Sequence, residues 1–147
     1  KNCLFLISGL ALKEKRFDYY TNSDVLEGNN DFTFEFGPYH TYLSSKLYSE
    51  KNIGEVIKRN YSINLNYKTT KKHIRQELFL FPCYYNKLYL SLIWAGDLDS
   101  DGNTDFLIQT PTPPNNELGY AIGLYLSSKA NSKELVKLVA YIISNES

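Results

Sequence analysis

Apolar and polar residues alternate with a period of two along much of the chain. The clearest runs are rich in aromatic and β-branched residues and cover residues 32–36, 61–67, 88–94 and 120–126. Because successive side chains of a strand point to opposite faces of a sheet, this alternation is typical of antiparallel strands with one buried face. Residues 74–81, which end before Pro82, and residues 3–7 are further strand candidates.

The strand pattern predicts an all-β or mostly β fold, organised as a single antiparallel domain over residues 1–147. A chain of 147 residues fits one domain, which buries roughly 70% of the unfolded surface on folding. Polar, turn-rich segments and the proline-rich residues 110–116 separate the strands,. A β-sandwich and an open barrel both satisfy this pattern.

Two stretches leave the secondary structure open. Residues 42–57 mix apolar spacings, and residues 52–58 could form one short helical turn. Residues 132–144 fit a helix with Ser132 as its N-cap, and they also alternate as a strand would,. The β-branched content of this second stretch favours the strand.

The segment 97–105 carries the clearest candidate chemistry. It reads D-x-D-x-D-G-x-x-D, a spacing that turns several carboxylates to the concave side of a tight loop. Gly102 allows the sharp backbone reversal, with a positive φ, and Leu98 is expected to point away and pack on the core. The expected metal ligands are Asp97, Asp99, Asp101, the backbone carbonyl of Asn103, and Asp105, which binds directly or through water,.

Calcium is the metal that this oxygen-rich loop predicts. Four carboxylates would repel one another without a cation, and no Lys or Arg lies between Asp97 and Asp105,. Magnesium demands a stricter octahedral geometry, and zinc prefers nitrogen and sulfur ligands. The twelfth loop position is Ile108, where an EF-hand has Glu, so we expect a calcium-binding strand–loop–strand hairpin. The alternative is an Asp-rich turn without a metal.

Residues 96–108, which read GDLDSDGNTDFLI, resemble the calcium loops of FG-GAP repeats in integrin-type β-propellers. A propeller needs at least about four blades, and the chain has one such loop. The resemblance therefore implies the metal site and not the propeller fold.

A wider resemblance covers about the C-terminal third of the chain. Residues 94–99, 124–130 and 134–140 are similar to segments of a group of uncharacterised bacterial exported proteins that share a WAGDLDxDGxxDFL segment. This resemblance implies a lineage and no activity.

Charge and cysteine content narrow the class of partner. The chain has 16 Lys and Arg against 16 Asp and Glu, and a formal net charge of zero argues against a general nucleic-acid binder. The basic residues between 68 and 75 fit a solvated hairpin turn, with an anionic partner as the alternative.

The apolar run at residues 4–12 is too short to span a bilayer. Cys3 and Cys83 either pair in an oxidising compartment or stay free and buried.

The leading functional hypothesis is a calcium-stabilised module that binds a protein, a peptide or a glycan. A site of modest calcium affinity suits a secreted, periplasmic or cell-surface location. Tyr19–Tyr20 and Tyr84–Tyr85 are expected in loops, where exposed tyrosine pairs can stack on sugars or peptides. The alternatives are a calcium-dependent hydrolase and a structural accessory domain of the cell envelope. The sequence contains no GxSxG, HExxH, P-loop or Rossmann motif, which favours a role other than catalysis.

Overall fold

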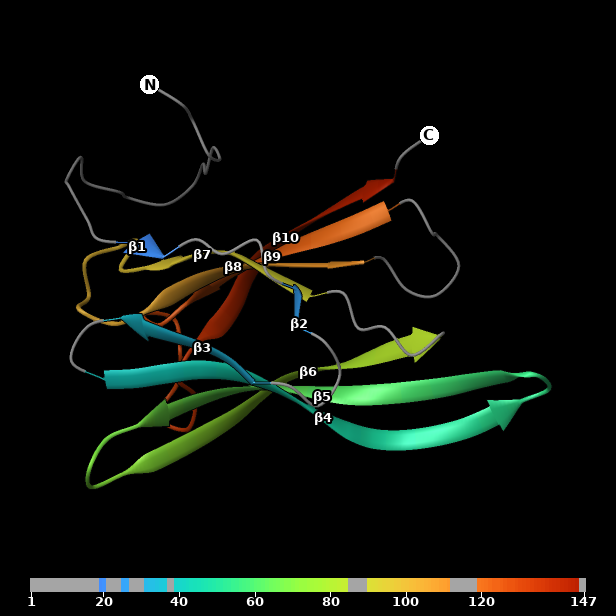
Figure 1. Cartoon of the computed structure of the whole chain (residues 1–147). Coiled ribbons are helices and arrows are strands. Elements are labelled where there is room, and N and C mark those ends of the chain that lie inside the picture. The colour runs from blue at the N-terminus through green and yellow to red at the C-terminus, as the bar shows by residue number, and fades with distance from the viewer. Residues whose placement is uncertain are drawn as a thin grey trace.

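The computed structural model describes residues 19–20, 25–26, 31–36, 39–84, 90–111 and 119–145. All the regular secondary structure in these residues is β-strand (Figure 1). They are β1 (Tyr19–Tyr20), β2 (Val25–Leu26), β3 (Asp31–Phe36), β4 (Tyr39–Ile53), β5 (Val56–Lys68), β6 (His73–Tyr84), β7 (Leu90–Gly96), β8 (Asp105–Pro111), β9 (Gly119–Leu126) and β10 (Lys137–Asn145). All paired strands run antiparallel, which confirms the predicted fold class.

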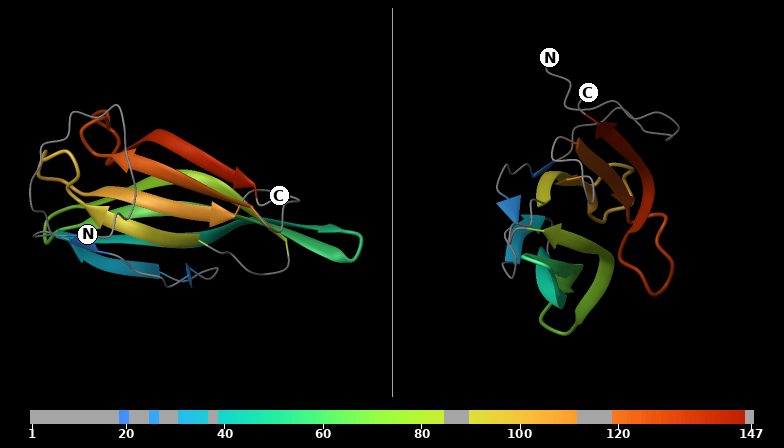
Figure 2. Two further views of the ribbon diagram at one scale, coloured as in Figure 1. Left: turned by 90° about the horizontal axis from the view of Figure 1, so that it is seen from above. Right: turned by 90° about the vertical axis from the view of Figure 1, so that its right-hand side faces the viewer.

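The strands form two sheets that face each other. The smaller sheet has the order β3-β4-β5-β6, and the larger has the order β1-β7-β8-β9-β10, with β2 also paired to β7. Figure 2 shows the two sheets as separate layers, so the fold is a sandwich and not a closed barrel. Apolar side chains of both sheets form the core between them: Leu43, Tyr61, Ile63, Leu65, Leu90, Leu92, Ala95, Phe106, Ile108 and Tyr125.

Residues 42–57 form most of a long β-hairpin. β4 and β5 pair up to Ile53 and Val56, and Gly54 in the turn between them has a φ of 62°. Glycine adopts this left-handed conformation without a steric penalty. The helical turn considered for residues 52–58 is therefore wrong, because the cross-strand ladder takes up the backbone hydrogen bonds. The hairpin tip extends past the rest of the sandwich (Figure 2).

Residues 137–144 belong to a strand, as their β-branched content predicts. β10 begins at Lys137 and pairs with β9. Ser132 lies in the preceding loop, outside any helix.

Two smaller expectations about strand ends are wrong. Pro82 does not close β6, which continues to Tyr84. β6 is an edge strand, and an edge tolerates a residue that lacks an N–H group. Tyr19 and Tyr20 are not in a loop either, because they form β1 and pair with Gly96 and Ala95.

A bulge in β7 sends Trp94 to an unexpected face. The alternation predicts that Leu92 and Trp94 share one face, but the register against β8 shifts between these two residues. An extra residue in one strand inverts the alternation beyond it. Ala95 therefore joins the core between the sheets, whereas Trp94 packs with Leu107 and Leu124 in a second buried cluster. Leu98 belongs to this second cluster, so its predicted packing is confirmed.

Polar side chains on the outer face of β5 are buried despite their polarity. They are Ser62, Asn64 and Asn66. Neighbouring strands supply their partners: the Ser62 hydroxyl donates to Glu77 Oε2 at 2.6 Å, and Asn66 Nδ2 donates to Ser44 Oγ at 2.9 Å. Because buried polar groups are costly only when they lack partners, this ladder of side chains fits the central strand of a sheet.

Several expectations fall outside the described residues. These are the strand candidate at residues 3–7, the side chain of Cys3, Tyr85, and residues 112–116 of the proline-rich segment. The pairing of Cys3 with Cys83 therefore stays a prediction. In the described part of the chain, no helix has the length and apolar character that crossing a membrane would take.

The packing of the sandwich predicts that the same substitution lowers the free energy of unfolding by very different amounts at two isoleucines of the β4–β5 hairpin. Ile63 is 0% exposed in the core, whereas Ile53 near the tip is 51% exposed. We expect Ile63→Ala to lower the free energy of unfolding by about 3 kcal/mol, because it leaves a cavity. Ile53→Ala should lower it by less than about 1 kcal/mol. Urea unfolding checks both values, and equal losses would contradict this packing.

Candidate metal centre

The acidic segment forms the loop between β7 and β8. Asp97 directly follows β7, and Asp105 is the first residue of β8, where it pairs with Gly96. The pairing closes the loop at its base, so the acidic side chains of residues 97–105 are confined to one end of the sandwich. This is the strand–loop–strand arrangement that the sequence predicts.

The loop is folded around the carboxylate of Asp97. Asp97 Oδ1 accepts hydrogen bonds from the backbone N–H groups of Ser100 at 2.7 Å and Asp101 at 3.1 Å, and Oδ2 accepts one from Gly102 at 3.2 Å. Gly102 has the predicted positive φ, at 85°, and Ser100 also has one, at 73°. The chain thus reverses sharply, with its amide groups directed at one carboxylate.

Asp105 is the most deeply buried acid of the loop, with 0% of its surface exposed. Its Oδ2 accepts a hydrogen bond from the N–H of Leu98 at 2.8 Å, and its Oδ1 accepts bonds from Ser127 N at 2.8 Å and Ser127 Oγ at 2.9 Å. Burial raises the pKa of Asp105 to about 6, and the nearby charge of Asp99 adds to the rise. The bonds from Ser127 and Leu98 oppose this rise in pKa without cancelling it,.

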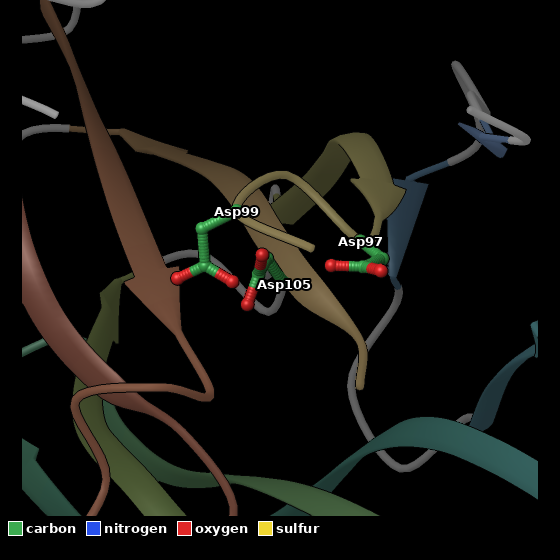
Figure 3. A group of neighbouring side chains, drawn as sticks. All are labelled: Asp97, Asp99 and Asp105. Atoms are coloured by element: carbon green, nitrogen blue, oxygen red, sulfur yellow. The ribbon is translucent and has the colours of Figure 1, made fainter. Parts of the chain in front are cut away.

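Three carboxylates converge on a common point. Oxygens of Asp97, Asp99 and Asp105 all lie within 4.8 Å of one another, and Figure 3 shows Asp99 and Asp105 side by side with Asp97 directed toward Asp105. The hydroxyl of Ser128 donates to Asp99 Oδ2. Asp99 Oδ1 is buried and has no hydrogen-bond partner. A buried oxygen without a partner is costly, and a cation at this point would satisfy it.

Two of the five predicted ligands lie at the rim of this group. The carboxylate of Asp101 accepts a hydrogen bond from Asn103 N at 2.8 Å, and it shares the Ser127 hydroxyl with Asp105, at 2.8 Å from Ser127 Oγ. Both Asp101 and Asn103 are exposed. The structure thus brings together Asp97, Asp99 and Asp105, and ligation by Asp101 and by the carbonyl of Asn103 stays a prediction.

Residues 127–136, the loop between β9 and β10, contribute partners to the acidic group that the sequence did not predict. Ser127 and Ser128 come from this loop and bond the acids of the β7–β8 loop. More than twenty residues separate the bonded groups, so no local spacing reveals them.

Gln76 holds the same loop to the opposite sheet. Its Oε1 accepts hydrogen bonds from Leu135 N at 2.6 Å and Val136 N at 3.0 Å, and its Nε2 donates to Val136 O at 2.8 Å. Residues 127–136 therefore join the acidic group of the larger sheet to β6 of the smaller sheet. Nothing in the sequence around Gln76 marks it for this role.

A cleft of about 540 Å³ lies beside the acidic loop. Its volume is in the range of small-ligand sites. The acidic loop, residues 127–136 and the β5–β6 hairpin supply its walls, which combine hydroxyl, amide, aromatic and charged groups: Gly102, Asn103, Thr104, Ser127, Asn131, Glu134, Leu135, Tyr67 and Lys72. Because Ser127 both lines the cleft and bonds Asp105, the cleft and the acidic group share a wall.

The raised pKa of Asp105 predicts the pH dependence of the metal-free protein. An acid with a pKa of about 6 when folded and 3.8 when unfolded binds more protons in the folded state. The free energy of unfolding therefore falls as pH rises between these values, by roughly 3 kcal/mol in total for this group. Urea unfolding with a chelator at pH 4.5 and pH 7 spans about 2 kcal/mol of this fall, and Asp105→Asn removes the titrating group. Equal falls in both proteins would contradict the assignment.

No protein-family model, curated protein or solved structure matches the chain. The identity of the ion that the acidic group would bind is therefore inferred from the geometry of Asp97, Asp99 and Asp105.

Proposed function

We propose that the chain is a calcium-binding β-sandwich domain in which the ion joins the β7–β8 loop to the loop that follows β9. The observation that carries this proposal is the convergence of three carboxylates around Asp99 Oδ1, a buried oxygen without a partner. Serines from residues 127–136 bond two of the acids, so an ion at this point would stabilise both loops at once.

The all-carboxylate group favours calcium over magnesium, because calcium takes six to eight oxygen ligands in a flexible geometry, whereas magnesium demands a near-ideal octahedron and keeps several waters. Oxygens bound to one calcium lie 2.3–2.6 Å from it and so at most about 5 Å from each other. The three acids meet the calcium limit as they stand, with their oxygens within 4.8 Å of one another. Zinc would choose nitrogen or sulfur, and all the converging groups are carboxylates.

The expected stabilisation fits a location outside the cytoplasm. Calcium sites of extracellular modules have dissociation constants of about 10⁻⁴–10⁻³ M. At 10 mM calcium, such affinities stabilise the folded state by about 1.4–2.7 kcal/mol. The domain would then be more stable where calcium is abundant, as in a secreted, periplasmic or cell-surface setting.

The cleft beside the loop favours a binding role over a purely structural one. Calcium would fix Gly102, Asn103 and Thr104, which line the cleft, and so would shape the surface that a peptide or glycan meets.

Glu134 is the acid of the cleft, but its Oε2 accepts a hydrogen bond from Asn131 N at 3.2 Å within its own loop. A calcium-dependent hydrolase would need an acid or base free to act beside the metal, so the binding role is the better supported of the two.

Removal of calcium should lower the melting temperature of the wild-type protein. We expect 10 mM calcium to raise it by about 3–10 °C over the value in chelator, and 10 mM magnesium to raise it less. Asp99→Asn should remove the calcium effect and should not destabilise the metal-free form, because it relieves repulsion among the acids. Differential scanning calorimetry measures all of these temperatures.

Glu55→Gln is the matched control for Asp99→Asn. Glu55 is exposed in the turn between β4 and β5, and its substitution removes the same charge far from the acidic group. This variant should keep the full calcium effect. Equal melting temperatures of the wild type in calcium and in chelator would overturn the proposal, and so would a calcium effect that Asp99→Asn retains.

A further inference from the structure

The cleft beside the acidic loop lies between two turns that carry opposite charges. The turn between β5 and β6 contributes Lys72 to the lining, and the loop after β9 contributes Glu134. Figure 1 shows both segments at the same end of the sandwich. These two are the charged residues of the lining, and in the part of the chain that the structure describes they do not form an ion pair with each other. The cleft therefore presents one positive and one negative group to a ligand.

Both charged side chains extend from turns that hydrogen bonds hold in place. Thr69 Oγ1 accepts a hydrogen bond from Lys72 N at 2.9 Å, and Thr69 N donates to Lys72 O at 2.8 Å. In the other turn, Glu134 N donates to Asn131 O at 3.1 Å, and Glu134 Oε2 accepts a bond from Asn131 N at 3.2 Å. A carboxylate has two oxygens that can each accept more than one bond, so Glu134 can still bind a ligand.

Gln76 fixes the spacing between the two charged walls. Its side chain bonds Leu135 and Val136, which directly follow Glu134. Gln76 itself belongs to β6, which begins directly after Lys72. Because both walls are held before a ligand arrives, little conformational freedom is lost on binding.

The uncharged part of the lining offers apolar and polar contacts. Ile74 and Leu135 are half-buried, and such apolar groups can contact an aliphatic or aromatic side chain. Asn103 and Thr104 add an amide and a hydroxyl group, which can pair with the N–H and C=O groups of a peptide backbone.

The aromatic residues of the lining favour a peptide over a glycan. Phe106 is 1% exposed, and Tyr67 is half-buried. Neither residue offers the open ring face on which a sugar stacks. A neutral sugar would also leave both Lys72 and Glu134 without a charged partner in the ligand.

We propose that the cleft binds short peptides with two free ends, with the α-carboxylate at Lys72 and the α-ammonium at Glu134. Both ends of a peptide are charged at pH 7, and hydrogen bonds between charged groups are stronger than neutral ones. The volume of about 540 Å³ suits a drug-sized ligand, and so a peptide of a few residues. This inference rests on the proposed binding role of the cleft and does not require that the bound ion be calcium.

NMR titration of the full chain at pH 7 tests this assignment. The probes are alanyl-leucyl-alanine and alanyl-phenylalanyl-alanine with free ends, their N-acetyl and C-amide forms, and the neutral sugar maltotriose. We expect the free peptides to shift the amide resonances of residues that line the cleft, with dissociation constants of about 10 μM to 1 mM. Capping either end should weaken binding about tenfold. Each titration is carried out both in calcium and in chelator.

Two variants assign the two ends separately. Lys72→Gln should remove the preference for a free carboxyl end and keep the preference for a free amino end. Glu134→Gln should do the reverse, and its amide oxygen can still accept the bond from Asn131 N. Lys71→Gln is the matched control, because Lys71 is exposed and adjacent to Lys72 but does not line the cleft. It should leave both preferences unchanged.

Three outcomes would overturn the proposal. They are the absence of binding by both free peptides up to about 10 mM, equal affinities for the free and the capped peptides, and binding of maltotriose in the cleft in place of the peptides. None of these outcomes alters the effect of calcium on the melting temperature. Failure of the peptide site is therefore distinguishable from failure of the calcium site.

Discussion

The buried carboxylate of Asp105 is the group on which this end of the sandwich depends. It accepts hydrogen bonds from the β7–β8 loop through Leu98 N and from the β9–β10 loop through Ser127. A buried charge is expensive unless it is paired. Without a metal, Asp105 is therefore either protonated or charged beside other carboxylates that repel it. A bound cation would remove the need for the proton and offset the repulsion.

Interactions that radiate from this carboxylate connect the two sheets. Residues 127–136 bond the acids at one end through Ser127 and Ser128, and they are held at the other end by Gln76 of β6. The Phe106 side chain, next to Asp105, is buried in the core between the sheets. An ion at the acidic group would thus act on a loop that both sheets share, which is why we attribute to it an effect on global stability and on the cleft.

The fold class and the sharp turn of the acidic loop could be predicted because both depend on local sequence. The alternation of residues 61–67 follows from the pleat of one strand, and Gly102 follows from one sharp turn. The position of Trp94 could not be predicted, since it depends on a bulge in the register between β7 and β8. Ser127 and Gln76 could not be predicted either, because their roles come from contacts between segments distant in the chain. The separation of Asp101 from the three converging acids likewise depends on how the loop folds around Asp97.

The central claim is that the group of Asp97, Asp99 and Asp105 binds calcium, and calorimetric titration at pH 6 tests it most directly. Calcium titrated into the protein in two buffers of different ionisation enthalpy reports both the number of ions and the number of protons released. Because burial raises the pKa of Asp105 to about 6, we predict one ion per chain, with release of part of a proton at this pH. Absence of calcium binding, or binding without proton release, would contradict the account.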